Sequence, residues 1–380
     1  MTILSGIKVV ELGQVLSGPF AGAILADLGA TVMKVEKPEG GDDARQMGPA
    51  FRHGDALNFH EFNRGKQSVA LDLKTPEGLD ALFRLLTDAD ILVHNLRPGV
   101  AETLGLGPEV VTARFPRLIY CAMGAFGHLG PLSLRPGYEP LFQAFCGLSS
   151  ITGEPDGPPV RMGASVVDQG TGMWTVIGAL AALQQRHRTG RGCVVNTSLF
   201  ETALMWAGQK ISAYVNMGKL PERHASGHPI SCPTRPSTPP MARCWCAAAM
   251  TGCSAILRGG RQPRLAGGPA LRHQPRPSRA SIGAAAGDRR AAAPWPRAAL
   301  AEALIAAGVP CAPVNSIPEV LAEPQTAAMS MLQPVPGEDF SLVAMPMSFD
   351  GERPRIRHGA PRLGQHGMTS EVIESPPEKG

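Results

Sequence analysis

The sequence predicts an α/β fold built on a parallel sheet. Short apolar runs alternate with segments of helical periodicity through the first 130 residues, as expected when helices connect the strands of one sheet. These runs resemble strands that are buried on both faces. The chain has 380 residues, which is long enough for two domains.

The first three predicted elements form a strand–helix–strand unit. Residues 7–12 are a short apolar run typical of a buried strand. Gly18 and Pro19 open an Ala-rich helix that ends before Gly29, and proline is favourable in a first helical turn. Residues 31–36 form the next strand, so the crossover between the two strands should be right-handed.

The same alternation continues along the chain. Thr75 is a predicted N-cap, with Pro76 at the first helical position. Further strands are predicted at 68–73, 91–94, 118–122 and 194–197, and further helices at 75–87, 168–184 and 199–217. Repeated alternation of this kind favours a parallel sheet covered by helices on both faces.

Residues 234–296 differ from the rest of the chain. Hydrophobic periodicity disappears there, and Arg, Pro, Ala and Gly dominate. Such a segment buries too little apolar surface to offset the entropy of ordering it, so we expect it to be poorly ordered. One interpretation is a natural low-complexity insertion. The other is translation out of frame in a GC-rich coding sequence, with the frame restored near Pro296, which the other reading frames of the coding DNA would reveal.

The distribution of charge argues against nucleic acid as a partner. The net charge is +4, but residues 234–301 contain eleven Arg and a single acid, Asp288, and carry +10. The rest of the chain, with 25 basic and 31 acidic residues, is mildly acidic. Because one unusual segment makes the whole chain basic, we expect no nucleic-acid binding.

Several other function classes are disfavoured. The eight cysteines form no CxxC pair, which suits neither a zinc site nor a disulfide framework. No apolar run reaches the roughly 18 residues of a membrane-spanning helix. The first residues lack the pattern of a secretory signal. We therefore expect a cytoplasmic protein with no metal site and no membrane association.

A series of short motifs carries a resemblance to a known family. The motifs occupy residues 11–20, 26–36, 63–68, 71–74, 95–99, 137–139, 188–192, 307–315 and 361–364. In their content and order the chain resembles the family III (CaiB/BaiF-like) CoA-transferases over roughly 1–232 and 298–373. One Gly-Pro or Thr-Gly-Arg-Gly match would be weak, but the shared order of all nine motifs is a specific signal.

The resemblance implies two-domain protomers that interlock as a homodimer, each with a Rossmann-like large domain. The expected parts are a large domain at 1–200 that 355–380 rejoins, a linker helix at 201–224, a small domain at 225–330 and a second linker at 331–354. The family does not use the dinucleotide fingerprint. Consistently, Gly13, Gly18 and Gly22 do not fit GxGxxG.

Asp168, within the segment 163–172, is the candidate nucleophile. A carboxylate can attack a thioester when it is held at the carbonyl and stripped of solvent. Taken alone, an aspartate at a helix start is more typical of an N-cap. The resemblance instead implies that Asp168 forms an acyl-aspartyl anhydride and then an aspartyl-CoA thioester. Glu139 is the second candidate catalytic residue, polarising or orienting groups near Asp168.

The resemblance also assigns residues to CoA, which acts as a substrate rather than as a permanently bound cofactor. Because CoA carries phosphates, cations and free N–H groups are expected near its adenine end. The assigned positions are Val15, Leu16 and Ser17 through their backbone, Lys37 near the ribose phosphate, and Leu71, Lys74, Asn95, Leu96 and Tyr138. At Thr103, where relatives commonly carry an arginine, no charge is present, and Arg97 is the expected substitute.

The expected reaction is CoA transfer from an acyl-CoA to a free carboxylic acid, and two alternatives stay open. The related acyl-CoA racemases place a His-Asp pair where this chain has Tyr138 and Glu139. Tyrosine, with an ordinary pKa near 10, is a poor base at neutral pH, which favours transfer. The second alternative is an inactive CoA-binding protein from a damaged gene, because no glycine-rich loop of the kind that covers the active site in relatives is recognisable within 234–296.

Overall fold

The computed structural model describes residues 2–223, 244–246, 297–306 and 311–367. The chain divides into two compact units. The first comprises 1–148, 161–217 and 324–380, and the second 149–160 and 218–323. The low-complexity stretch 234–296 lies outside the described residues, apart from Cys244–Cys246. The domain boundaries expected from the sequence stay predictions.

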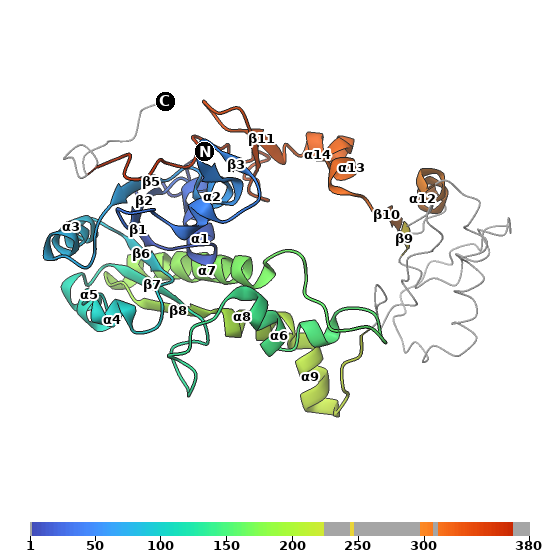
Figure 1. Cartoon of the computed structure of the whole chain (residues 1–380), viewed down its shortest axis with the longest axis horizontal. Helices are drawn as coiled ribbons and strands as arrows, with labels where there is room; N and C mark the ends of the chain where they lie inside the picture. The colour runs from blue at the N-terminus through green and yellow to red at the C-terminus, as the bar shows by residue number, and fades with distance from the viewer. Residues whose placement is uncertain (1, 224–243, 247–296, 307–310, 368–380) are drawn as a thin grey trace. The chain divides into compact units, whose positions relative to one another are not determined.

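The first unit is built on a six-stranded parallel sheet (Figure 1). Its strands are β1 (Lys8–Leu12), β2 (Thr31–Glu36), β5 (Gln67–Ala70), β6 (Ile91–His94), β7 (Ile119–Gly124) and β8 (Val194–Ser198). They lie in the order β5-β2-β1-β6-β7-β8. Counted along the chain this is 3-2-1-4-5-6, the strand order of the Rossmann fold. The predicted α/β class and parallel sheet are confirmed.

Helices cover both faces of this sheet, as the strand pattern predicts. On one face, α1 (Ser17–Asp27) and α7 (Val166–Thr189) pack against a cluster that includes Val9 and Val93. On the other face, α3 (Pro76–Thr87), α4 (Val100–Thr103) and α5 (Pro108–Arg114) pack against a cluster that includes Val10 and Leu92. Neighbouring residues of a strand point to opposite faces, so both faces of the central strands are apolar.

Local sequence signals explain where two helices begin and end. Thr75 caps α3 by accepting a hydrogen bond from the N–H of Gly78, with Pro76 in the first turn, as predicted. Helix α7 is longer than the predicted 168–184, and it ends at Gly190, which is left-handed with φ of 73°. Apolar periodicity stops after Leu183 because the last turns carry polar residues. Glycine at this position is a common helix terminator, since it has no Cβ.

The first unit contains several further elements. They are β3 (Phe51–Arg52), β4 (Asp55–Ala56), α2 (Leu57–Asn63), the 3₁₀ turn η1 (Asp43–Gln46), α6 (Glu139–Phe145), α8 (Leu199–Trp206), α9 (Gly208–Met217), α14 (Pro324–Ala328), β11 (Leu332–Pro334) and β12 (Ser341–Val343). The helical stretch predicted at 199–217 is thus two helices, with Ala207 between them. Near the C-terminus, Gly364 and His366 donate backbone hydrogen bonds to Ser68.

The second unit contains fewer described elements. They are the 3₁₀ turn η2 (Ser149–Ile151), β9 (Cys244–Cys246), α12 (Arg297–Ala306), β10 (Cys311–Pro313) and α13 (Ile317–Ala322). Strands β9 and β10 pair antiparallel, with Cys311 opposite Cys246. A capping box begins α13, where Ser316 and Glu319 exchange hydrogen bonds between side chain and backbone. Such reciprocal bonds satisfy two free N–H groups at a helix start.

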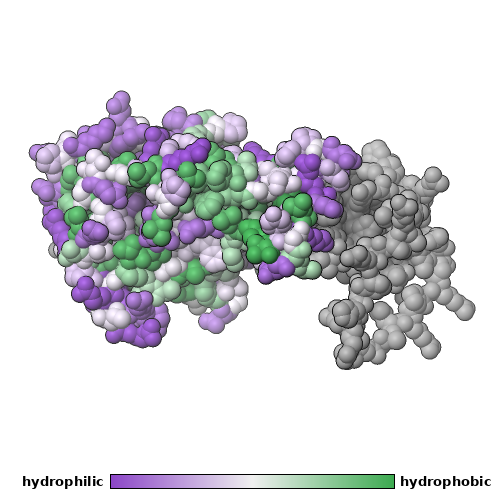
Figure 2. Space-filling model, turned by 90° about the horizontal axis from the view of Figure 1, so that it is seen from below, coloured by the Kyte–Doolittle hydropathy of each residue, from purple (hydrophilic) through white to green (hydrophobic). Residues whose placement is uncertain are grey.

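Apolar side chains also reach the surface of the first unit, along α8 and α9. Met205 is 62% exposed, Tyr214 53% and Val215 72%. Figure 2 shows apolar residues exposed between polar ones on the face that it views. A cluster of exposed apolar side chains on a globular protein often marks a contact surface.

Candidate active site

The loops that follow the strands meet at one edge of the sheet, because all six strands run in the same direction. Ligands of open α/β sheets bind at this edge, where the strand order reverses. Here the reversal lies between β1 and β6. The predicted residues 15–17 come after β1, and Asn95 comes after β6. The sequence-predicted residues therefore flank the reversal point.

Residues 13–17, the β1–α1 loop, are held by side chains from outside the loop. Asn95 accepts a hydrogen bond from the N–H of Gln14 at 2.8 Å and donates one to the Gln14 carbonyl at 2.8 Å. Asp42 accepts from the N–H of Val15 at 3.0 Å. Val15 has a φ of 66°, which is costly for a β-branched residue. Its environment therefore maintains a conformation that the residue disfavours.

Beneath this loop, Glu11, Lys34, Asp42 and Lys66 form a buried charge cluster, with side chains that are 0% exposed. The Lys34 amine lies 3.0 Å from Glu11 and 2.8 Å from Asp42. It also donates to the carbonyl of Gly13 at 2.7 Å. Lys66 lies 2.7 Å from the other oxygen of Glu11. The cluster thus connects the sheet to both Gly13 and Val15 of the loop.

Mutual attraction favours the charged forms of Lys34 and Asp42. Burial alone would lower the pKa of Lys34, but Glu11 and Asp42 outweigh it and the pKa is raised. Burial would raise the pKa of Asp42, but Lys34 brings that pKa below its ordinary value. For Lys66, burial prevails and lowers the pKa to about 8. Buried ion pairs persist when each charge has a close partner and further hydrogen bonds.

Gly22 of α1 has no side chain, and the charge cluster fills the space where one would lie. A Cβ at this position would lie 1.8 Å from a carboxylate oxygen of Glu11 and 3.0 Å from the side chain of Lys66. Helix α1 can therefore approach β1 only with glycine here. A larger residue would displace either the helix or the ion pair.

Sequence reasoning missed the charge cluster, although a signal was present. Glu11 and Lys34 each lie inside an apolar strand that was predicted to be buried. A charge is tolerated in such a position only with a partner of opposite sign. Two opposite charges in adjacent strands of a strand–helix–strand unit could have predicted the pair. Asp42 and Lys66 follow in loops or strand ends and carry no comparable local signal.

Asp168 lies in the first turn of α7 and is partly buried. The N-cap of α7 is Ser165, so Asp168 is not the capping residue. The pKa of Asp168 is raised to about 7, first because of burial and second because of the negative charge of Glu139. A hydrogen bond with the Ser17 side chain acts in the opposite direction. A carboxylate with such a pKa titrates near neutral pH, as catalytic groups often do.

Glu139, the first residue of α6, is 3% exposed. One of its carboxylate oxygens accepts hydrogen bonds from Gln143 at 2.7 Å and from the N–H of Val167 at 3.5 Å. The other oxygen is buried without a hydrogen-bond partner. Gln143 in turn accepts from the N–H of Met162 at 2.7 Å. Glu139 therefore contacts Val167, the residue before Asp168, and helps to hold the segment that precedes the candidate nucleophile.

The other predicted residues lie in the loops of the same edge but do not converge as closely. Lys37 pairs with Asp43 at 2.7 Å, and both side chains are more than half exposed. Lys74 and Arg97 are exposed, and Tyr138 is 64% exposed at the N-cap of α6. Leu71 is buried, whereas Leu96 is half-buried. The structure thus brings together Ser17, Asn95, Glu139 and Asp168, and leaves the three predicted cations on the surface.

His94 supports Asn95 from inside the sheet. The hydroxyl of Tyr120 donates to the carbonyl of Leu106 at 2.8 Å, so it accepts from the Nε2–H of His94 at 2.9 Å. The Nδ1 of His94 then accepts from the N–H of Leu96 at 3.4 Å. Burial lowers the pKa of His94 to about 4. The imidazole is therefore neutral and acts as a fixed donor and acceptor beside Asn95.

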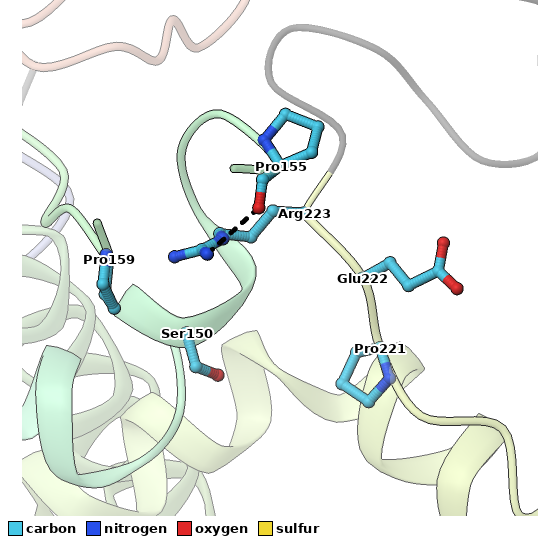
Figure 3. Close-up of a pocket in the computed structure, with 6 residues that line it drawn as sticks. All are labelled: Ser150, Pro155, Pro159, Pro221, Glu222 and Arg223. Carbon is cyan, nitrogen blue, oxygen red and sulfur yellow. Dashed lines mark hydrogen bonds between the residues drawn. The ribbon is translucent and has the colours of Figure 1, made fainter. Parts of the chain in front are cut away.

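The second unit contains an open pocket of about 520 Å³ that involves none of the predicted site residues. It is lined by Ser150, Pro155, Pro159, Pro221, Glu222 and Arg223 (Figure 3). Arg223 donates a hydrogen bond to the carbonyl of Pro155 at 3.2 Å. The lining thus combines three prolines with the polar side chains of Ser150, Glu222 and Arg223.

Two further searches cover only the residues that the structure describes. Within them, no three His, Cys, Asp or Glu side chains are grouped so that they could hold a metal ion. None of the described helices combines the length and apolar character needed to cross a membrane.

Comparisons of the sequence and of the structure with known proteins match the same family. The model of CoA-transferase family III matches residues 4–367. Succinate–glutarate CoA-transferase of Agrobacterium fabrum is 35% identical over 392 aligned positions, covering 96% of this chain and 93% of that protein. Acetyl-CoA:oxalate CoA-transferase of Acetobacter aceti is 34% identical, covering 98% and 96%. A CaiB/BaiF family protein from Brucella suis has a similar structure, with a TM-score of 0.85, 34% identity and coverage of 96% and 97%.

Proposed function

Because the chain belongs to CoA-transferase family III, we propose that it transfers CoA from an acyl-CoA thioester to a free carboxylic acid through Asp168. The resemblance stated from the motifs is confirmed at the level of the family. The observation that supports the finer proposal is the position of the Asp168 carboxyl, partly buried beside Glu139 and Ser17. These groups lie with the β1–α1 loop, at the edge of the sheet where ligands of such folds bind.

The proposed reaction needs no net proton transfer. A carboxylate oxygen of Asp168 attacks the thioester carbonyl, and the CoA thiolate leaves, which gives a mixed anhydride. The thiolate then attacks the aspartyl carbonyl and releases the donor acid as its carboxylate, leaving an aspartyl-CoA thioester. The acceptor carboxylate attacks the carbonyl of that thioester and releases the CoA thiolate, which gives a second anhydride. The thiolate then attacks the acceptor's acyl carbonyl, and the new acyl-CoA forms as the anhydride bond to Asp168 breaks. Asp168 is thereby restored as a carboxylate.

Partial burial suits each of these steps. A carboxylate in water is strongly hydrated and a weak nucleophile, and removal of water raises its reactivity. Shielding also protects the anhydride and the thioester from hydrolysis. One carboxylate oxygen of Glu139 is buried without a hydrogen-bond partner. This is unusual, because buried polar atoms in folded proteins are nearly always hydrogen-bonded. We assign Glu139 to orienting the segment 162–168, through Gln143 and Val167.

We assign the CoA contacts to the loops of the same edge. The backbone of Val15, Leu16 and Ser17 lies at the start of α1, where N–H groups attract phosphate or carbonyl oxygen. Lys37, Lys74 and Arg97 are exposed cations that can reach phosphates. The remaining assigned contacts are Leu71, Asn95, Leu96 and Tyr138. Succinyl-CoA with glutarate and acetyl-CoA with oxalate, named for the two relatives, are the first substrate pairs to test.

We also propose a homodimer, which the exposed apolar side chains of α8 and α9 support. Burying that surface against a second chain would remove apolar area from water. Light scattering coupled to size exclusion would give the mass of a dimer, and Tyr214→Glu would lower it toward that of one chain. A monomer at micromolar concentration contradicts this assignment. We propose a cytoplasmic location.

The decisive experiment traps the covalent intermediate. Incubation with succinyl-CoA followed by hydroxylamine should convert Asp168 to its hydroxamate, detected by peptide mass spectrometry, and borohydride should reduce the same thioester. Asp168→Asn should give neither product. Folded protein with no trapped residue supports an inactive CoA-binding protein. Exchange of the α-hydrogen of a branched acyl-CoA with deuterium, without transfer, would support a racemase instead.

A further inference from the structure

Ser17, assigned to CoA only through its backbone, has a side chain that reaches the proposed nucleophile. Ser17 is the first residue of α1 and is 6% exposed. Helices α1 and α7 cross closely there, since a Cβ on Gly172 would lie 2.8 Å from the carbonyl oxygen of Ser17. Gly172 lies one turn beyond Asp168 and so on the same side of α7. This crossing brings the start of α1 against the turn of α7 that carries Asp168, and the Ser17 side chain is a hydrogen-bonding partner of the Asp168 carboxyl.

The direction of that hydrogen bond follows from the groups around it. The N–H of Gln14 can only donate, so the atom of Asn95 that it contacts at 2.8 Å is the amide oxygen. The amide nitrogen of Asn95 therefore points to the Gln14 carbonyl and to the Ser17 oxygen, at 2.8 and 3.4 Å. Because Ser17 accepts from Asn95, its own proton is available for Asp168. An ionised carboxylate can only accept, which completes the order Asn95 to Ser17 to Asp168.

We propose that the Ser17 hydroxyl, oriented by Asn95, holds the Asp168 carboxylate in its reactive position and stabilises its charged form. The inference rests on the proposed function, in which Asp168 is the nucleophile. In each turnover the same donor would face the aspartyl carbonyl of the anhydride and of the thioester, where negative charge develops on oxygen. It would also stabilise the carboxylate as it leaves the second anhydride. The hydroxyl keeps its proton throughout.

The charges around Asp168 leave this role to Ser17. Burial and Glu139 of α6 both raise the pKa of Asp168, and Ser17 is the group among the described residues that lowers it. On α8, the carboxylate of Glu201 is occupied by the capping residue Ser198 at 2.5 Å. Behind α1, Glu11 and Lys66 neutralise each other at 2.7 Å. No cation of the described part of the chain is paired with Asp168. The neutral hydroxyl of Ser17 is therefore the donor that favours the charged form of this carboxyl.

A double-mutant cycle on the full chain tests this without depending on turnover. The free energy of unfolding in urea is measured at pH 5 and pH 8 for the parent, Ser17→Ala, Asp168→Asn and the double variant. We expect coupling between the two positions at pH 8, where Asp168 is ionised, and a coupling reduced several-fold at pH 5, where it is protonated. Equal coupling at both pH values, or none, overturns the proposal.

Kinetics provide the second readout. In Ser17→Ala the acid limb of kcat/KM against pH should move up by roughly half a unit to one unit, so the loss of activity relative to the parent should be about three- to tenfold larger at pH 6 than at pH 9. Ser17→Thr, which keeps the hydroxyl, should restore the profile. Thr175→Val is the matched control, because it removes a buried α7 hydroxyl that bonds Thr197 rather than Asp168. It should lower stability without moving the limb.

The outcomes separate this inference from the proposed function. If Asp168→Asn still exchanges CoA at the parent rate, the proposed function is wrong and the inference falls with it. If Asp168→Asn is inactive while Ser17→Ala keeps the parent profile and shows no pH-dependent coupling, only the role of Ser17 is rejected. If Ser17→Ala does not fold, Ser17→Cys, with its weaker donor, should give a smaller shift in the same direction, and an unshifted limb there rejects the role as well.

Discussion

Two groups of buried charges in the first unit differ in how they are paired. In the charge cluster of Glu11, Lys34, Asp42 and Lys66, each carboxylate faces an amine at 2.7 to 3.0 Å. Asp168 has Glu139 as its charged neighbour and a hydroxyl as its donor. Close opposite charges stabilise the charged forms of their partners, whereas burial, and next the charge of Glu139, raise the pKa of Asp168 to about 7. The difference indicates that the charge cluster stabilises the fold, whereas Asp168 has the perturbed pKa that is typical of catalytic groups.

The largest effect that this comparison predicts is on catalysis at the unpaired carboxyl. Replacement of Asp168 by Ala removes the proposed nucleophile, and CoA exchange should fall by at least about 10³-fold. The rate of acyl-CoA consumption with a dicarboxylate acceptor measures it. Asp43→Ala, an exposed carboxylate at the same edge, is the control for loss of a nearby negative charge. An Asp168→Ala protein that retains a tenth of the parent rate would contradict the assignment.

The next effect concerns the paired cluster. Lys34→Met leaves Glu11 and Asp42 buried without their shared cation, and should lower the free energy of unfolding by about 3–5 kcal/mol. Urea denaturation measures the change. Lys37→Met, three residues along the chain, breaks an exposed pair with Asp43 and should cost no more than about 0.5 kcal/mol. Equal losses in the two variants would mean that the buried cluster does not stabilise the fold.

Gly22 tests the contribution of the charge cluster to stability through packing. Gly22→Ala places a methyl group against the Glu11 carboxylate, and should cost about 1–3 kcal/mol, because both the helix and the ion pair resist displacement. Gly163→Ala, at a glycine with open space around its Cβ position, should change stability much less. Thermal unfolding of the two variants side by side measures the contrast. Gly22→Ala as stable as the parent would indicate that α1 moves freely over β1.

An effect of similar size is predicted for the cost of burying Asp168 beside Glu139. The pKa of Asp168 rises from 3.8 to about 7 on folding, so the folded state binds more protons than the unfolded state between these values. Stability contributed by this group is therefore present at low pH and is lost as pH rises through 7. Asp168→Asn should be more stable than the parent at pH 8, by roughly 1–3 kcal/mol, and similar to it at pH 4.

This last prediction is measured as the difference in unfolding free energy between Asp168→Asn and the parent at each pH. Using the difference removes the contribution of Lys66, whose pKa of about 8 makes it titrate in the same alkaline range. A difference that does not change between pH 4 and pH 8 would show that folding leaves the Asp168 carboxyl unperturbed.

Much of the architecture could be predicted from local sequence patterns. Strands such as β1 and β2 are predicted by short apolar runs, and Thr75 with Pro76 predicts the start of α3. The far end of α7 could not be predicted from periodicity, because polar residues continue the helix to Gly190. The break at Ala207 between α8 and α9 likewise carries no strong local signal. Local patterns predict secondary structure where the buried residues recur with the period of a helix or strand. They fail where an element continues through residues that are not buried.

What the sequence by itself determined is the succession of strands and helices, the family and the candidates Asp168 and Glu139, since these depend on residues that are close along the chain. Only the tertiary structure decided that β1 and β6 flank the reversal of the sheet, that Lys34 reaches Gly13 and Asp42, and that Ser17 meets Asp168. These partners come from separate elements. Their contacts exist because helices pack on both faces of one sheet, and that packing brings together side chains that no local pattern connects.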